Sequence, residues 1–213
     1  MAEDWEKYWK SKTILNRIVD FMRINYFADI PPSYLGNMEG KTILEAGCGT
    51  SESLVRIAKK AKKVTGIDIS EKALARSRIN FADNKVSKEK YSLVLGDIQK
   101  MKFEDNTFDI TFNTGVVEHF DDDKINSKPV EEMVRVTKKG GKIVILVPSV
   151  YSPYCVYYLF TRIPGLNDLF PWEAHRFYTY KMLKNQLKAL NLNFKIRLNF
   201  KSLFLYIVAI IRK

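Results

Sequence analysis

Hydrophobic residues along the chain fall into two kinds of run, short continuous ones and longer ones with helical spacing. Short continuous runs are typical of strands that are buried on both faces, as parallel sheets require. The predicted strands are residues 42–46, 63–68, 92–95, 108–113 and 141–147. Helices are predicted between them at residues 50–61, 70–84 and 129–137. This alternation predicts right-handed βαβ units and therefore a doubly wound α/β sheet.

The N-terminal residues 1–32 predict an amphipathic helix or helix pair, with Trp9 on one of its apolar faces. Pro31-Pro32 is expected to end this unit, because proline cannot continue a helix. The unit has no place in the strand–helix alternation, so we interpret it as a cap over the mouth of the site. A simple packing helix is the alternative, since Trp9 contacts a substrate only if it faces that mouth.

Residues 150–178 predict an inserted substrate lid, since seven of the twenty-two residues 151–172 are aromatic and prolines interrupt any long helix. The aromatic side chains could line a large apolar pocket, or they could form the lid's own core. The candidates for substrate contact are Tyr151, Tyr154, Tyr158 and Trp172. Residues 179–213 then predict a helix and two antiparallel strands with a turn near 199–202.

A length of 213 residues with 46% hydrophobic content favours one domain, 1–213, whose cofactor-binding core is 41–149. The charged N-terminus predicts no secretory leader. The longest uncharged apolar run, residues 203–211, is shorter than the ~20 residues that span a bilayer. Two cysteines form neither a disulfide framework nor a metal set, so we expect a cytoplasmic protein without a metal.

The net charge of +11 is concentrated near the C-terminus, where residues 174–213 contain nine Lys or Arg and no Asp or Glu. Such a surface can contact an anionic membrane at its periphery, or it can bind nucleic acid. We favour the membrane over nucleic acid. A lysine-rich proteome explains the charge about as well, and the oligomeric state is left open.

The first strand leads into a glycine turn and a helix between residues 41 and 58. Gly47 and Gly49 let the backbone turn tightly and approach a ligand closely. A dinucleotide fingerprint needs a third glycine in G-x-G-x-x-G, but Glu52 stands there and no P-loop lysine follows. Its carboxylate would repel a pyrophosphate, and Glu45 before the turn adds negative potential. We therefore expect a ligand without phosphate groups and with positive charge.

Two further acids stand at the ends of the next two strands. Asp68 ends the second strand, where a carboxylate can accept hydrogen bonds from both ribose hydroxyls. Asp97 follows the third strand and is placed to accept from an adenine amino group, with Ile98 and Ile69 as apolar walls for the ring. Ligands of doubly wound sheets bind beyond the carboxyl ends of the strands, so these acids are expected in one site.

The order and spacing of these motifs resemble the class I S-adenosylmethionine-dependent methyltransferases, in the small-molecule, quinone and glycan branch called methyltransferase type 11. ILEAGCGTS looks like their motif I, VTGIDIS like their second, acidic motif, and LVLGDIQKMKF like their third. FDITFNTGVVEHF looks like the fourth, and EEMVRVTKKGGKIVILVPS resembles the helix–GG–strand segment that follows it. The resemblance covers residues 41–149, half of the chain.

The resemblance implies a Rossmann-like, seven-stranded sheet with an antiparallel last strand, which agrees with the predicted C-terminal strand pair. It implies S-adenosylmethionine as the cofactor, with Asp68 at the ribose and Asp97 and Ile98 at the adenine. The methionine part is then expected at Glu45, Gly47, Cys48, Gly49, Asn113 and Thr114. Ser51 departs from the family, which most often has a third glycine there; we expect a modest loss of closeness and no loss of binding.

The reaction that the resemblance implies is an in-line attack of a substrate nucleophile on an activated methyl group. The protein then chiefly supplies alignment, worth up to ~7–11 kcal/mol for well-oriented partners. A general base is needed only for a poorly acidic nucleophile such as a hydroxyl, and the candidates are His119 and His175. Either can instead be a structural, hydrogen-bonding histidine. We interpret Glu118 as a buried acid at a helix start rather than as a catalyst.

The turn after the fourth strand reads Asn-Thr-Gly-Val and lacks the Asn-Pro-Pro-Tyr tetrapeptide that the family uses for amino-group methylation. We therefore expect methylation of an oxygen or carbon atom of a small or amphiphilic molecule, such as a quinone, lipid or sugar intermediate. An RNA or protein methyltransferase is the rival enzyme, favoured by the positive charge. A catalytically silent, cofactor-binding subunit is the alternative of another class.

Overall fold

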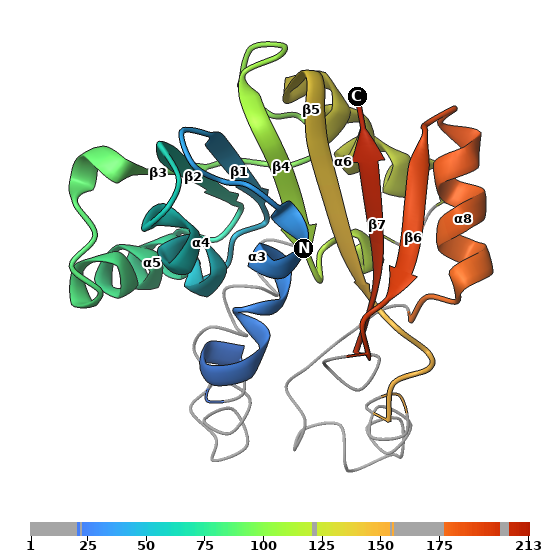
Figure 1. The fold of residues 1–213 in the computed structure, drawn as a ribbon, viewed down its shortest axis with the longest axis horizontal. Helices are drawn as coiled ribbons and strands as arrows, with labels where there is room; N and C mark the ends of the chain where they lie inside the picture. The colour runs from blue at the N-terminus through green and yellow to red at the C-terminus, as the bar shows by residue number, and fades with distance from the viewer. Residues whose placement is uncertain (1–20, 22, 121–122, 154, 156–176, 201–204) are drawn as a thin grey trace.

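The computed structural model describes residues 21, 23–120, 123–153, 155, 177–200 and 205–213. Within these residues, seven strands form one sheet in the order β3-β2-β1-β4-β5-β7-β6 (Figure 1). The strands are β1 (Thr42–Ala46), β2 (Lys63–Asp68), β3 (Tyr91–Leu95), β4 (Phe108–Thr114), β5 (Thr137–Pro148), β6 (Phe194–Leu198) and β7 (Tyr206–Arg212). The pairs from β3 through β5 are parallel, whereas β7 is antiparallel to both of its neighbours. The predicted sheet with an antiparallel last strand is confirmed.

Helices cover both faces of this sheet (Figure 1). One face carries α3 (Ile30–Leu35), α4 (Glu52–Ala58) and α5 (Glu71–Asp83), and the other carries α6 (Asp123–Val136) and α8 (Tyr180–Ala189). Three short helical turns complete the described elements: η1 (Arg23–Phe27), η2 (Lys88–Lys90) and η3 (Val117–His119). The doubly wound arrangement follows from strands that must be covered on both sides.

Strand β5 shows how the sequence builds the two hydrophobic layers. Val144 and Leu146 pack in the layer under α3, α4 and α5, whereas Ile143 and Ile145 pack in the layer under α6 and α8. Successive side chains of a strand point to opposite faces, so a continuous apolar run serves both layers at once. The strand is central because each of its edges pairs with a neighbour, β4 on one side and β7 on the other.

The carboxyl ends of β1, β2, β3, β4 and β5 lie along one edge of the sheet, at the lower end of the molecule in Figure 1. The chain reverses its direction of sheet growth between β1 and β4, because β2 and β3 lie to one side and β5 to the other. Loops that leave neighbouring strands in opposite directions open a crevice at this switch point. The fold thereby positions the turns after β1, β2 and β4 for a common ligand.

Two sequence-based boundaries are wrong. Pro31-Pro32 does not end a helical unit but stands in the first turn of α3, where the missing N–H groups have no helical partner to lose. The strand predicted at 141–147 begins earlier, at Thr137, so that Gly140 and Gly141 lie inside β5, whose pairing with β4 shifts register beyond Phe108. A side chain on Gly141 would collide with Thr137 Cγ2 at 2.6 Å, so the shift requires glycine.

The predicted N-terminal cap (1–32) and lid (150–178) lie largely outside the described residues. The predicted turn near 199–202 lies partly outside them as well, although the strands on either side of it pair as expected. The division of the chain into cap, core (41–149), lid and C-terminal unit (179–213) stays a prediction. Helix α8 begins after Thr179, whose side chain accepts a hydrogen bond from Met182 N, as capping requires.

Candidate cofactor and methyl-transfer site

The turn after β1 is held against β2 by its backbone. Gly47 N and Cys48 N both donate to Ile67 O, at 2.8 and 3.0 Å. Gly47 and Gly49 have φ angles of +77° and +51°, a region that glycine enters without steric penalty. A Cβ atom on Gly47 would lie 2.5 Å from Val116 Cγ2, in the turn after β4. The two turns therefore meet so closely that only glycine fits between them.

Ser51, which stands where the family most often has a third glycine, changes the structure of the turn. Ser51 has a φ angle of +63°, so a non-glycine residue occupies the left-handed region where the family most often has glycine. Its hydroxyl donates to Ser77 Oγ at 3.0 Å, and Ser77 Oγ donates to Gly49 O at 2.8 Å. These bonds tie the turn to α5 and compensate part of the backbone strain. The expectation that Ser51 keeps the turn slightly farther from a cofactor, without loss of binding, stays a prediction.

Asp68 braces the same turn from the end of β2. Its Oδ2 atom accepts a hydrogen bond from Gly49 N at 2.8 Å, and its Oδ1 atom accepts one from Ser70 N at 2.9 Å. Burial raises the pKa of Asp68, and the backbone N–H donors act in the opposite direction. Each carboxylate oxygen can accept a second hydrogen bond, so Asp68 can still bind two ribose hydroxyls.

Glu45, Glu52 and Asp68 form a cluster of acids around the glycine turn. Burial raises the pKa of Glu45 well above its usual value, and the charges of Glu52 and Asp68 raise it further. Within the described residues, Glu45 Oε2 is buried without a hydrogen-bond partner, whereas Glu52 accepts from the Thr50 hydroxyl. Buried negative charges that raise one another's pKa are stabilised by a cation. The site is therefore suited to a positively charged ligand.

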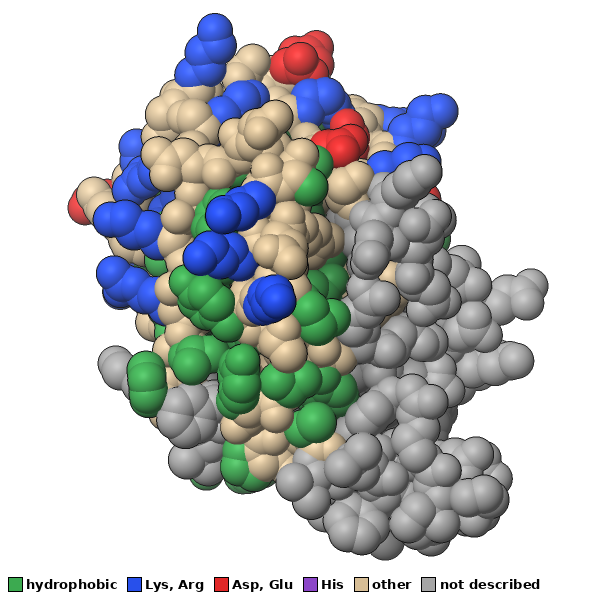
Figure 2. All heavy atoms as spheres, turned by 90° about the vertical axis from the view of Figure 1, so that its right-hand side faces the viewer, with side chains coloured by type: hydrophobic (Ala, Val, Ile, Leu, Met, Phe, Trp, Pro, Cys, Tyr) green, Lys and Arg blue, Asp and Glu red, His purple; other side chains and the backbone are tan. Residues whose placement is uncertain are grey.

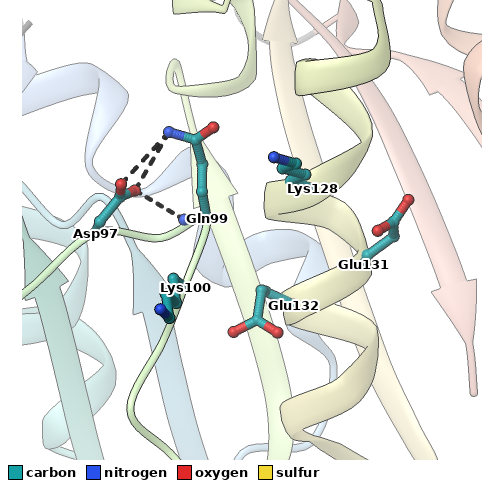
Figure 3. Close-up of a pocket in the computed structure, with 6 residues that line it drawn as sticks. All are labelled: Asp97, Gln99, Lys100, Lys128, Glu131 and Glu132. Carbon is teal, nitrogen blue, oxygen red and sulfur yellow. Dashed lines mark hydrogen bonds between the residues drawn. The ribbon is translucent and has the colours of Figure 1, made fainter.

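Asp97 lies at the edge of the site, in the loop after β3. Its Oδ1 atom accepts a hydrogen bond from Gln99 N at 2.8 Å, and the Gln99 side-chain amide lies 3.5 Å from both carboxylate oxygens (Figure 3). Ile98 is buried behind it, and Ile69 is partly exposed after β2. Asp97 also borders an open cavity of about 420 Å³, shared with Gln99, Lys100, Lys128, Glu131 and Glu132. This cavity lies between the loop and α6 (Figure 3).

The end of β4 and the short helix η3 after it carry polar side chains that are buried without hydrogen-bond partners among the described residues. Both polar atoms of the Asn113 side chain and the Thr114 hydroxyl have no hydrogen-bond partner among the described residues. The same holds for both carboxylate oxygens of Glu118, which is 1% exposed. Buried polar groups are normally satisfied, so these atoms are available to bind a ligand.

The structure brings together most of the predicted residues that it describes. Glu45, the turn 47–49, Asp68, Asn113 and Thr114 come from adjacent strand ends, and His119 is buried nearby in η3. Tyr151 follows β5 and is 49% exposed. Five predicted site residues lie outside the described residues: Trp9, Tyr154, Tyr158, Trp172 and His175. The predicted roles of all these residues stay predictions.

Sequence reasoning missed the contribution of Val116, whose side chain closes over Gly47. No local pattern signals this contact, because it depends on the alignment of β1 with β4. Sequence reasoning also set Glu118 aside as a structural acid, although the structure leaves its carboxylate without a partner from another described residue. The signal that could have found it is the single acid that directly follows two apolar residues in the Val-Val-Glu-His segment.

These residues fit S-adenosylmethionine. Its sulfonium and ammonium charges match the acid cluster, and its ribose hydroxyls match the free acceptor positions of Asp68. The unsatisfied polar atoms of Asn113 and Thr114 offer both donors and acceptors to an amino acid moiety. The bound cofactor supplies the reaction with an electrophilic methyl group on positively charged sulfur. The acid cluster, Asp68, Asn113 and Thr114 would bind and orient it.

The family described as "Methyltransferase domain" matches residues 44–145. Among curated relatives, a demethylmenaquinone methyltransferase of Staphylococcus aureus (strain MRSA252) is 31% identical over 73% of this chain and 65% of its own. Proteins of the same name are 27% identical in Bacillus subtilis, over 78% of this chain and 72% of the relative, and 28% identical in Halalkalibacterium halodurans, over 68% and 58%. The chain thus spans 58% of the Halalkalibacterium protein.

Solved structures share the fold at low sequence identity. A magnesium protoporphyrin IX methyltransferase from Synechocystis PCC 6803, crystallised with SAH, has a TM-score of 0.71 at 13% identity and covers 99% of this chain and 94% of its own. A SAM-dependent methyltransferase from Aquifex aeolicus has a TM-score of 0.68 at 15% identity, with 94% and 98% coverage.

The fold and the site define an α/β domain that is suited to a cationic ligand at the switch point of its sheet. The family match places residues 44–145 in the methyltransferase-domain family, and the relatives support a class I S-adenosylmethionine-dependent methyltransferase. Among the described residues, no group of three or more His, Cys, Asp or Glu is placed to hold a metal ion. No helix in the same residues is long and apolar enough to cross a membrane.

Proposed function

We propose that this enzyme transfers a methyl group to an oxygen or carbon atom of a small or amphiphilic molecule, with a reduced quinone as the leading acceptor. The observation that carries the cofactor half is the cluster of Glu45, Glu52 and Asp68 around a glycine turn. The acceptor half is supported by relatives that are named demethylmenaquinone methyltransferase. Lipid and sugar intermediates are the other acceptors of this class.

The experiment supplies the purified protein with S-adenosylmethionine labelled in its methyl group and with four fractions of a cell extract: lipids, water-soluble small molecules, RNA and protein. A short-chain hydroquinone kept reduced by dithionite is the defined probe. We expect label in the lipid fraction and in the hydroquinone. Asp68→Asn is the matched control, because it keeps the side-chain shape but removes the negative charge that we expect to bind the ribose hydroxyls.

Each rival predicts a different outcome of this experiment. Label that enters only RNA or protein would overturn the small-molecule proposal in favour of the macromolecular methyltransferase. Cofactor binding by calorimetry, combined with no labelled product in any fraction, would instead support the silent subunit.

We also propose that the protein works in the cytoplasm and contacts anionic membranes through the surface of α8 and β6. In the described residues of these elements the charged side chains are Lys181, Lys184, Lys188, Lys195 and Arg197, all basic. Figure 2 shows Lys and Arg side chains above a group of hydrophobic ones on this side of the molecule. The exposed aromatic residues Tyr180 (41%), Tyr151 (49%) and Phe200 (71%) belong to the end that carries the cofactor site.

Charge complementarity favours an anionic lipid surface as the partner, at about 1 kcal/mol per basic residue near it. We expect sedimentation with vesicles of phosphatidylcholine and phosphatidylglycerol, weaker at high salt, and none with phosphatidylcholine alone. Lys181→Glu with Lys184→Glu should abolish it. Lys59→Glu with Lys60→Glu, at the exposed end of α4, is the charge-matched control. Equal binding to neutral vesicles, or by both double variants, would overturn the proposal.

A further inference from the structure

Glu118 is a buried carboxyl that forms no stabilising hydrogen bond with another described residue. It lies in η3, directly after the β4 turn, with 1% of its surface exposed. Neither carboxylate oxygen has a hydrogen-bond partner from another described residue; only its own backbone N–H favours the charged form. An unpaired buried acid destabilises a protein, so its presence calls for a role outside the packing.

The environment of Glu118 makes it a stronger base than an exposed carboxylate. Burial raises the pKa of this carboxyl from 4.5 to about 8. Helix α6 and strand β5 pack against η3, and no charged side chain from the described residues of either contributes to the shift. His119 is the titratable neighbour in sequence. A carboxylate with a pKa near the working pH accepts a proton far better than an ordinary one does.

The position of Glu118 ties it to the methyl-transfer end of the site. A Cβ atom on Gly115 would lie 3.3 Å from Glu118 Oε1, so the carboxyl approaches the β4 turn where the chain has no side chain. Gly115 directly follows Asn113 and Thr114, whose buried polar atoms also lack partners among the described residues. The unsatisfied carboxyl thus lies against Gly115, the residue that directly follows the unsatisfied end of β4.

We propose that Glu118 is the proton acceptor of methyl transfer, and that the acceptor group is an ionisable hydroxyl such as that of a hydroquinone or enol. This inference rests on the proposed function. In O-methylation the O–H bond breaks, and its proton passes to a Glu118 carboxylate oxygen. The hydroxyl oxygen forms a bond to the methyl carbon, while the bond from that carbon to sulfur breaks and its electron pair stays on sulfur. In C-methylation the same proton leaves the hydroxyl, and the ring carbon forms the bond to the methyl carbon as the carbon–sulfur bond breaks. The C–H bond of that ring carbon then breaks, its electron pair restores the aromatic ring, and the oxygen regains a proton, so that the hydroxyl is re-formed.

The test compares wild type, Glu118→Gln and Glu89→Gln on a short-chain hydroquinone kept reduced by dithionite, with labelled S-adenosylmethionine across pH. Glutamine keeps the size of the side chain but cannot accept the proton, and Glu89 is an exposed glutamate of η2, away from the site. We expect kcat/KM of wild type and Glu89→Gln to rise with pH up to about 8. Glu118→Gln should be slower by about 10²–10⁴-fold and should lose this rise.

Two further readouts separate a proton acceptor from a structural residue. Binding of S-adenosylhomocysteine, measured by calorimetry, should be the same in all three proteins. The deficit of Glu118→Gln should shrink for a fluorinated hydroquinone, because a more acidic hydroxyl needs less help to lose its proton.

A wild-type rate and pH profile in Glu118→Gln would overturn the role of Glu118 and leave the proposed function intact. A wild-type protein that binds the cofactor but methylates no hydroquinone would remove the proposed acceptor and the inference with it. A deficit that stays constant across both hydroquinones would also overturn proton transfer.

Discussion

Replacing Glu118 with glutamine should change how the stability of the protein depends on pH. Burial raises the pKa of Glu118 from 4.5 to about 8 in the folded state, whereas the unfolded chain keeps the ordinary value. The folded state therefore binds this proton more tightly than the unfolded state does. The stabilisation from the bound proton is complete below about pH 4.5 and is lost as the pH rises through about 8.

The size of the effect follows from the pKa difference. A shift of one unit corresponds to about 1.4 kcal/mol, so the change from 4.5 to about 8 corresponds to about 5 kcal/mol. Wild type should lose about 4 kcal/mol of this stabilisation between about pH 5 and about pH 8.5. Glutamine does not titrate, and its buried amide costs about 1–3 kcal/mol at every pH. The free energy of unfolding of Glu118→Gln should therefore increase relative to that of wild type as the pH rises.

Urea unfolding at several pH values, followed by circular dichroism, measures the free energy of unfolding of both proteins. The difference between them cancels the titration of the other buried acids, which both proteins share. Glu89→Gln is the control, because its side chain is exposed on η2 and its curve should run parallel to that of wild type. A difference between Glu118→Gln and wild type that stays constant across this range would refute the buried, unpaired state of Glu118.

Two other predictions concern the cofactor turn. Gly47→Ala should destabilise the protein by about 1–3 kcal/mol and weaken cofactor binding in calorimetry, because its Cβ would lie 2.5 Å from Val116 Cγ2 at a φ of +77°. Gly40→Ala also has a positive φ but no atom within 4 Å, so it should cost about 1 kcal/mol and leave binding unchanged; equal effects would contradict the close approach. Asp68→Asn should weaken S-adenosylhomocysteine binding by about 10–100-fold, since a charge-assisted hydrogen bond contributes about 1.5–3 kcal/mol; unchanged affinity would remove Asp68 from the site.

Local patterns predicted those parts of the fold that depend on neighbouring residues. The strand at Thr42–Ala46, the glycine turn and the helix after it could be read from apolar periodicity and from the conformational freedom of Gly47. The antiparallel pair at the C-terminus was also predictable, because two apolar runs are separated by a short polar segment. Pro31 was placed at a helix end rather than a helix start, because proline fits both positions by its local chemistry.

The sequence by itself determined the class of ligand, because the acids Glu45, Glu52 and Asp68 and the missing P-loop lysine are matters of residue type and spacing. Only the tertiary structure decided the closeness of Val116 to Gly47 and the burial of Glu118. The contact depends on how β4 aligns with β1, which pairs Glu45 with Phe112. The pKa of a carboxyl depends on the surface that other segments remove from water, and no local pattern contains that information.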